Sequence, residues 1–163
     1  MKKLILTLML VALFFSCTTP NNDKANIELI ERYVQAVQDV DIAAMESILD
    51  DDYVGLGPSI NDSVGKQMVL ANWEALGTDY YESLIYTKSR MATLDITYGD
   101  NQGEWVSNWA VMSAVFKADH QSITIWANSV YQVKNNKIIK SYTFYNEADG
   151  LEQLGFVFTH PGN

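Results

Sequence analysis

Acidic side chains are the groups in this sequence that could serve as a general base. None lies within the strand cores expected to face inward, and Glu104 is at the end of one of these strands. The other candidates lie at predicted helix ends, where carboxylates more often cap a helix or face water: Asp39, Asp41, Asp50, Asp51 and Asp52.

The histidines and the cysteine add little further chemistry. His120 lies in a predicted turn and His160 in the C-terminal tail, where neither is placed for catalysis. Cys17 is the single cysteine, so the chain can form no internal disulfide and has no set of thiolate ligands for a soft metal. We therefore expect no metal site and no cofactor.

The N-terminus has the features of an export signal. Lys2 and Lys3 precede a mostly apolar run at 4–15, and Ser16 and Cys17 follow it. This run of twelve residues is shorter than the roughly 20 that a membrane-spanning helix needs. A cleaved signal peptide is therefore favoured over a permanent membrane span.

The end of the apolar run, LFFSC at 13–17, resembles the lipobox of bacterial lipoproteins, in which a small residue precedes a cysteine. The resemblance implies cleavage after Ser16 and acylation of Cys17. The protein would then be exported and held at a membrane of the bacterial cell envelope by its lipid. An ordinary signal peptide followed by a chance cysteine is the alternative. The polar residues 18–24 would form a short tether.

The chain is acidic, with a formal net charge of −9 that becomes more negative when Lys2 and Lys3 are removed with the signal. Binding to phosphate groups needs clustered lysine and arginine side chains, which this sequence lacks. We therefore exclude nucleic acid and anionic lipid headgroups as partners.

Apolar residues at helical spacing come first in the mature chain, and long segments rich in β-branched and aromatic residues follow. The predicted helices cover 26–38, a short stretch from 42, 64–76 and 149–155, and the predicted long strands cover 83–98, 104–117, 122–134 and 137–146. Gly77 is expected to end the third helix. Helices before an antiparallel meander make an α+β pattern, with the helices covering one face of the sheet.

Pairing the strands through their short turns assigns the two faces of the sheet. With Asn135 and Asn136 as a two-residue turn, Val133 lies opposite Ile138, and Tyr131 lies opposite Lys140. The expected inner face holds Asn108, Ala110, Met112, Ala114, Phe116, Ala127, Ser129, Tyr131, Tyr142 and Phe144. The outer face holds Trp105, Trp109, Val111, Trp126, Val130 and Tyr145. So aromatic a face predicts an interface, and we expect a homodimer through Trp105, Trp109, Trp126 and Tyr145.

Three stretches resemble the SnoaL-like domains of the nuclear transport factor 2-like superfamily: ERYVQAVQDVDIAAMESILDDDYV, GKQMVLANWEAL and NNKIIKSYTFYNEADGLEQLG. The resemblance covers about 25 to 155. It implies a cone-shaped α+β fold, with N-terminal helices packed on a curved antiparallel sheet around a pocket. The expected organisation is a signal peptide at 1–16, the lipidated cysteine and tether at 17–25, a SnoaL-like domain at 26–156 and a tail at 157–163.

The resemblance also bears on the chemistry of the pocket. SnoaL-like cyclases place a catalytic aspartate where this chain has Asn146, and an amide cannot take up a proton at neutral pH. Asn146 could contact a ligand or cap the final helix. The segment of Asp52 borders the pocket in the family, which makes Asp52 the candidate substitute base. Tyr53, Asn108 or Asn146 would then polarise the carbonyl of a substrate. The expected pocket residues are Tyr53, Trp73, Arg90, Asn108, Met112, Tyr131, Tyr142 and Asn146.

Three hypotheses remain open from the sequence. The first is a lipid-anchored domain that binds a small, mostly apolar molecule without catalysis. The second is an enzyme that isomerises, dehydrates or cyclises a carbonyl substrate. In the third, side chains fill the cone, and the protein interacts with partners through the back of its sheet. Fold alone does not decide among them.

Overall fold

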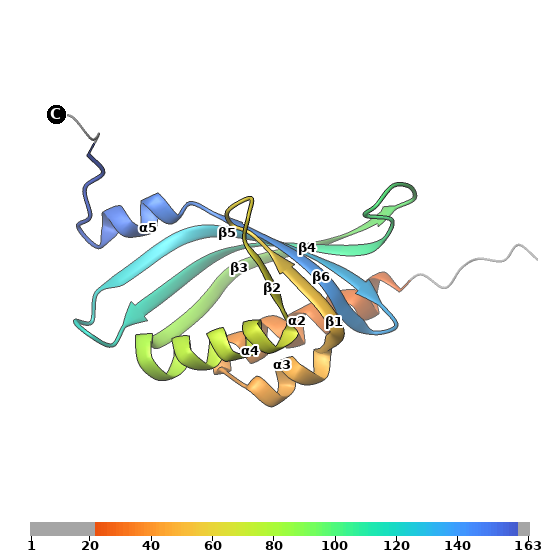
Figure 1. The fold of residues 1–163 in the computed structure, drawn as a ribbon, viewed down its shortest axis with the longest axis horizontal. Coiled ribbons are helices and arrows are strands. Elements are labelled where there is room, and N and C mark those ends of the chain that lie inside the picture. Colours follow the sequence, from red (N-terminus) through yellow and green to blue (C-terminus); the bar gives the residue numbers. More distant parts are fainter. Residues whose placement is uncertain (1–21, 160–163) are drawn as a thin grey trace, which may run out of the picture.

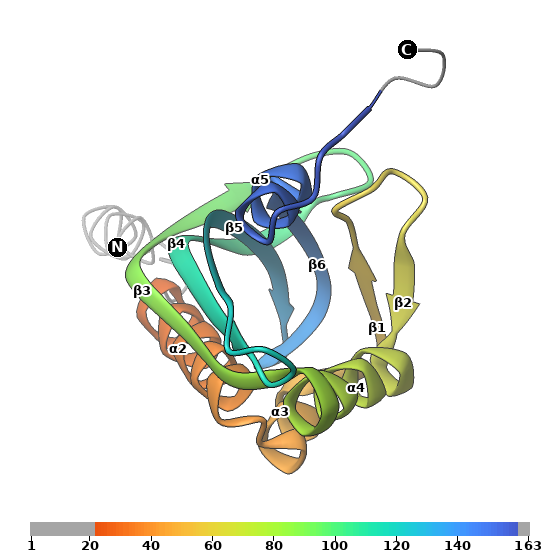
Figure 2. The ribbon, with the colours of Figure 1, turned by 90° about the vertical axis from the view of Figure 1, so that its left-hand side faces the viewer.

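The computed structural model of this chain describes residues 22–159. The predicted signal peptide, Cys17 and His160 lie outside this range. Within it, α-helices lie against one side of a strongly curved sheet (Figures 1 and 2). No helix in this range combines the length and apolar character needed to cross a membrane.

Three helices precede the long strands, as the sequence predicts: α2 (Asp23–Asp39), α3 (Ile42–Ile48) and α4 (Lys66–Ala75). α3 begins after Asp41, whose carboxylate accepts a hydrogen bond from the Ala44 amide at 2.9 Å. The prediction that Gly77 ends the third helix was wrong, because the chain continues into a π-helical turn, η2 (Leu76–Tyr80). A Cβ on Gly77 would meet the Val40 side chain at 2.5 Å, so the glycine serves close packing there.

The sheet has six strands in the order β2-β1-β6-β5-β4-β3. Their bounds are β1 (Leu49–Leu56), β2 (Ser63–Gly65), β3 (Tyr81–Ile96), β4 (Gly103–Phe116), β5 (Ser122–Lys134) and β6 (Lys137–Tyr145). The predicted antiparallel meander of the four long strands is confirmed. The whole sheet is mixed, however, because β1 runs parallel to β6.

The predicted faces of β4 and β5 are confirmed, but the pairing of β5 with β6 slips by one residue from the predicted register. Val133 lies opposite Ile138 as expected, but an irregularity next to this pair places Gln132, and not Tyr131, opposite Lys140. Because neighbouring strand residues face opposite sides, this single extra residue exchanges the faces of the rest of β6. Ser141, Thr143 and Tyr145 therefore face inward, and Tyr142 and Phe144 face outward.

The last helix, α5 (Glu147–Gln153), packs beside β5 at the end of the molecule opposite the start of α2 (Figure 1). Here β6 has already ended, so the backbone of Thr124 lacks a strand partner on that side. The Gln153 side chain fills this place, accepting from the Thr124 amide at 2.8 Å and donating to the Thr124 carbonyl at 3.0 Å. One glutamine thus attaches the helix to the sheet.

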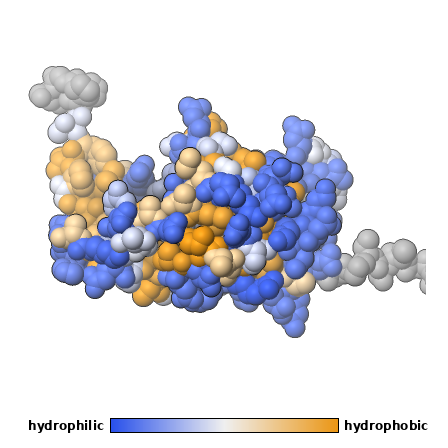
Figure 3. Space-filling model, turned by 60° about the horizontal axis from the view of Figure 1, so that its bottom comes forward, coloured by the Kyte–Doolittle hydropathy of each residue, from blue (hydrophilic) through white to orange (hydrophobic). Residues whose placement is uncertain are grey.

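Apolar surface gathers where the described chain ends. Phe156, Val157 and Phe158 follow α5 and are exposed, and Figure 3 shows this apolar end next to the grey C-terminal residues. The fully buried core lies elsewhere, between the helices and the inner face of the sheet, around Leu29, Met45 and Ile138.

Candidate functional site

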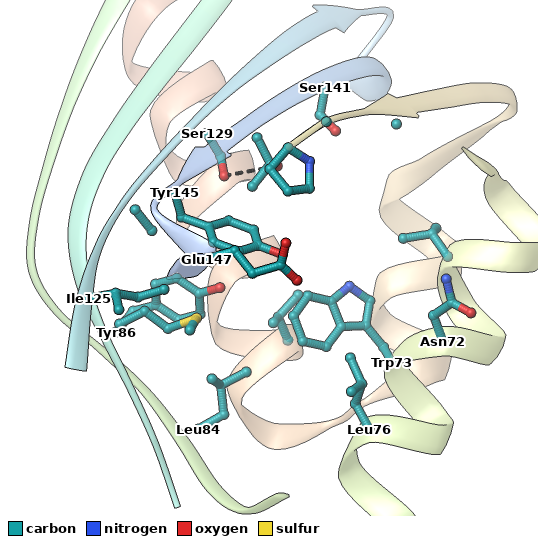
Figure 4. Close-up of a pocket in the computed structure, with 18 of the residues that line it drawn as sticks. Asn72, Trp73, Leu76, Leu84, Tyr86, Ile125, Ser129, Ser141, Tyr145 and Glu147 are labelled. Carbon is teal, nitrogen blue, oxygen red and sulfur yellow. Dashed lines mark hydrogen bonds between the residues drawn. The ribbon is translucent and has the colours of Figure 1, made fainter. Parts of the chain in front are cut away.

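A cavity of about 420 Å³ lies between the inner face of the sheet and the helices α2, α4 and α5 (Figure 4). This volume falls in the range of small-molecule pockets, about 300–1,000 Å³. Its walls are mostly apolar, with contributions from residues such as Val37, Leu84 and Ile125. Asn72, Tyr145 and Glu147 are lining residues that are also exposed, so they mark what we call the mouth of the cavity.

Tyrosines supply most of the polar groups inside the cavity. Tyr33, Tyr53, Tyr86 and Tyr131 all line it. Burial raises the pKa of each of these phenols, and for Tyr131 the value rises to about 12. The phenols therefore keep their protons at neutral pH and act as hydrogen-bond donors or acceptors, and not as bases.

Short hydroxyl contacts hold part of this wall in place. The hydroxyls of Tyr53 and Ser141 lie 2.7 Å apart and join β1 to β6. The hydroxyls of Ser129 and Thr143 lie 3.2 Å apart and join β5 to β6. Because these groups already have partners, a ligand can share their remaining hydrogen-bonding capacity without leaving them unpaired.

Glu147 is the only charged side chain among the described residues that line the cavity. It is the first residue of α5, and its carboxylate points into the cavity, with Tyr145 on one side and Trp73 on the other (Figure 4). Burial raises the pKa of the Tyr145 phenol, and the charge of Glu147 raises that pKa further. The mouth of the cavity is therefore aromatic and negatively charged.

Comparison with known proteins identifies the domain. The family model of the SnoaL-like domain matches residues 30–141. The chain belongs to the SnoaL-like family. No curated protein matches it.

Several solved structures share the fold of this SnoaL-like chain. A candidate polyketide cyclase from Xanthomonas campestris has a TM-score of 0.68 at 15% identity, covering 82% of this chain and 99% of that one. A protein with a ketosteroid isomerase-like fold from Catenulispora acidiphila, solved with trimethylamine, has a TM-score of 0.61 at 14% identity, covering 88% and 100%.

A nuclear transport factor 2-like protein from Burkholderia xenovorans has a TM-score of 0.63 at 11% identity, covering 80% of this chain and 96% of that one. At such identities these likenesses concern the fold alone. They place the SnoaL-like chain in the nuclear transport factor 2-like fold, as the sequence predicted, and leave its activity to be argued from the site.

Four of the residues predicted for the pocket line this cavity: Tyr53, Trp73, Met112 and Tyr131. Asn108 lies on the inner face opposite Ser129 and is buried, but it is not part of the cavity wall. Among the described residues, its side-chain oxygen is the buried side-chain polar atom without a hydrogen-bond partner. That oxygen can accept a hydrogen bond from a water molecule.

The structure places three other predicted pocket residues outside the cavity. Arg90 is exposed and donates to the Ser89 carbonyl beside an irregularity in β3. Tyr142 faces outward, because of the slip in β6, and stacks on Trp105 at 5.9 Å between ring centres. Asn146 caps α5 by accepting a hydrogen bond from the Asp149 amide at 3.3 Å.

Asp52, the candidate base, is exposed and does not line the cavity. It lies in β1 directly before Tyr53, and neighbouring residues of a strand point to opposite sides. Since Tyr53 is buried against the cavity, the Asp52 carboxylate is directed away from it. The described residues hold no cluster of carboxylates, histidines and cysteines suited to a metal ion.

Two of the four residues predicted for a dimer interface are exposed on the outer face, namely Trp109 and Trp126. Trp105 belongs to the same face but is buried within the chain, where its indole donates to the Asn101 carbonyl at 2.8 Å. Tyr145 faces the cavity because of the slip in β6. Phe144 takes its place on the outer face and is 53% exposed.

The sequence did not predict Glu147 or Tyr86 as residues of the site, and it placed Tyr145 on the outer face of the sheet. Tyr86 lies opposite Met112, which was assigned inward, so the register between β3 and β4 would have revealed it. The signal for Glu147 was weaker. It directly follows Asn146, where the last strand ends and the helical turn of α5 directs the next side chain to the mouth.

Proposed function

We propose that this SnoaL-like chain is an exported, lipid-anchored protein that binds a small, mostly apolar molecule in the cavity without converting it. The observation that carries the proposal is the cavity itself, about 420 Å³ in volume and lined by phenols among aliphatic side chains. A few hydrogen-bonding groups on an apolar wall are the usual composition of a small-molecule site. The trimethylamine complex of the Catenulispora acidiphila protein supports small-molecule binding in this fold.

Binding without catalysis is supported by the groups that the cavity contains. Its buried phenols have raised pKa values and stay protonated at neutral pH. The position that SnoaL-like cyclases use for a catalytic aspartate is Asn146, whose side chain caps α5. No lysine, arginine or histidine is found among the lining residues of the described chain.

A second candidate function rests on Glu147. A carboxylate at the mouth could remove a proton from a carbonyl substrate, while a phenol such as Tyr145 donates to the developing oxyanion. This enzyme would use a base one residue beyond the position of the cyclase aspartate. It predicts turnover that Glu147→Gln abolishes, whereas the binding function predicts no turnover.

The deciding experiment measures ligand binding and ligand fate together. Full-length protein would be analysed by native mass spectrometry for a co-purifying molecule, and by thermal shift against a library of small apolar alcohols, ketones and amines. Ala127→Leu adds three carbon atoms and narrows the cavity from β5, and Val130→Leu is a smaller enlargement, by one carbon atom, on the outer face of the same strand.

We expect binding that Ala127→Leu weakens and Val130→Leu leaves unchanged, with each ligand recovered intact. A library without any hit and a protein without a bound molecule would contradict the binding function. A ligand recovered in altered form would establish the enzyme instead.

A further inference from the structure

We propose that the mouth of the cavity binds the cationic head of an alkylated amine, while the apolar interior holds the rest of the molecule. This inference rests on the proposed binding function and names the chemical class of its ligand. The structural feature behind it is the combination of one carboxylate with several aromatic rings at a mouth that contains no positive side chain.

The charges around the mouth favour a cation. Glu147 is the only charged residue in the described cavity wall, and Asp62 is a second carboxylate close enough to act on Tyr145. Lys117 is not part of the cavity wall, and its ammonium is held by the carbonyls of Gly77 and Thr78. An anionic ligand would meet uncompensated negative charge here, whereas a cation would be attracted by it.

The aromatic rings provide the second half of the site. Tyr145 and Trp73 flank the Glu147 carboxylate in Figure 4, and Tyr81 lines the same cavity. Tyr81 is close enough to Tyr145 to contribute to the raised pKa of its phenol. The faces of tryptophan and tyrosine rings attract cations, and they are the usual partners of quaternary ammonium groups.

The degree of alkylation follows from the shortage of hydrogen-bond acceptors. A primary ammonium carries three N–H donors that all need acceptors once they leave water. The side-chain acceptors at the mouth are few, namely the Glu147 carboxylate, the Asn72 amide oxygen and the Tyr145 hydroxyl. The rest of its surface consists of ring faces and aliphatic groups such as Leu76 and Leu154. A tertiary or quaternary ammonium has one donor or none, so it can be desolvated against these rings at lower cost.

The test compares a cation with an uncharged molecule of the same shape. Choline and its carbon isostere 3,3-dimethylbutan-1-ol differ in one atom and one charge, and their binding to the full-length protein can be measured by calorimetry or by ligand-observed NMR. The variants are Glu147→Gln and, as a matched control on the same helix outside the cavity wall, Glu152→Gln. Tyr145→Phe and Tyr145→Leu separate the aromatic ring from the hydroxyl.

We expect choline to bind at least about fivefold more tightly than its isostere. Glu147→Gln should remove most of that preference, and Glu152→Gln should keep it. Tyr145→Leu should weaken choline binding more than Tyr145→Phe, because phenylalanine retains the ring face. Circular dichroism of each variant distinguishes a lost site from a lost fold.

Three outcomes would overturn the inference, and the first two separate it from the proposed function. If the isostere binds as tightly as choline, the cavity binds small molecules but does not select a cation. If neither binds while neutral members of the apolar library do, the ammonium assignment is wrong and the binding function stands. If no member of either set binds, both proposals fail.

Discussion

The hydroxyls of Tyr53 and Ser141, 88 residues apart in the chain, lie 2.7 Å from each other and connect the parallel strands β1 and β6. Both residues are buried and both line the cavity. The contact therefore stabilises the fold and also sets the position of one phenol in the candidate site.

Ser141→Ala should lower the free energy of unfolding by about 1–2 kcal/mol, because it leaves the buried Tyr53 hydroxyl without its partner. Tyr53→Phe removes the other half of the same contact. The double variant should lose clearly less stability than the sum of the two single losses, since both remove one interaction. Urea denaturation of the four proteins measures this coupling. Strict additivity would contradict the contact.

Gly57→Ala should be among the most destabilising single changes in the domain. Gly57 has a φ of 95°, and a Cβ there would overlap the carbonyl oxygen of Thr143 in β6. Gly99 provides the control, because its φ of 80° is similar but no atom lies within 4 Å of the added Cβ. Both changes carry backbone strain of roughly 1–2 kcal/mol, and Gly57→Ala adds the overlap. Equal losses in urea denaturation would show that β6 moves aside.

Stability should decrease with rising pH between about pH 10 and pH 12. Burial raises the pKa of Tyr131 to about 12, whereas a phenol in the unfolded chain titrates near 10. The folded state therefore retains a proton that the unfolded state loses, and the stabilisation present below pH 10 disappears as the pH passes 12. The loss from this residue is roughly 2–3 kcal/mol.

Tyr131→Phe tests the origin of this effect. The variant should show a shallower decrease in the free energy of unfolding between pH 10 and pH 12 than the natural protein. Tyr98→Phe, at an exposed tyrosine, serves as the control and should keep the full decrease. An unchanged slope in Tyr131→Phe would mean that other buried phenols dominate.

Trp126→Lys should disrupt the homodimer that we propose through the outer face of the sheet. Trp126 is 70% exposed and Trp109 is 46% exposed. Two exposed indole rings on one face of a sheet are typical of an interface with another protein chain. A central tryptophan of an interface often contributes about 2 kcal/mol or more, so the dissociation constant should rise at least about tenfold. Tyr98→Lys, 82% exposed outside the sheet, is the matched control. Sedimentation of the natural protein as a monomer at all concentrations would contradict the dimer.

Cys17→Ser should abolish the lipid modification that the N-terminal sequence predicts. In a bacterial host the natural chain should incorporate an alkyne-labelled fatty acid and sediment with membranes, and the variant should do neither. Ser16→Ala keeps a small residue before the cysteine and should retain the label. Label that persists in Cys17→Ser would place the modification elsewhere.

The order of elements and the fold could be predicted because they depend on long, regular patterns. Apolar residues at helical spacing predicted α2, and the turn at Asn135 and Asn136 predicted the β5–β6 hairpin. Both asparagines adopt the left-handed conformation in the structure. The faces of β6 could not be predicted, because the irregularity falls at Ile138 and Ile139, where either residue suits the inner side. A slip at this one position moves every later side chain of β6 to the opposite face of the sheet.

The candidate site was predicted in part for the same reason. Tyr53, Trp73, Met112 and Tyr131 lie on elements whose periods were recognised, whereas Tyr145 and Glu147 follow the slip in β6. The prediction that Arg90 lies in the pocket was wrong for a related reason. The irregularity in β3 near Lys88 is not visible in the alternation of polar and apolar residues. Local backbone irregularities thus decided which residues of the site were missed.

Gln153, which joins α5 to the sheet, is a different residue from those that α5 presents to a ligand. The glutamine bonds only to the Thr124 backbone and to Asp149, so no side chain of the cavity wall takes part in these hydrogen bonds. Glu147 and Leu151 can therefore be exchanged without removing these hydrogen bonds. This seven-residue segment can thus carry different ligand-facing side chains on the same sheet, which makes it the natural place to re-engineer the selectivity of the cavity.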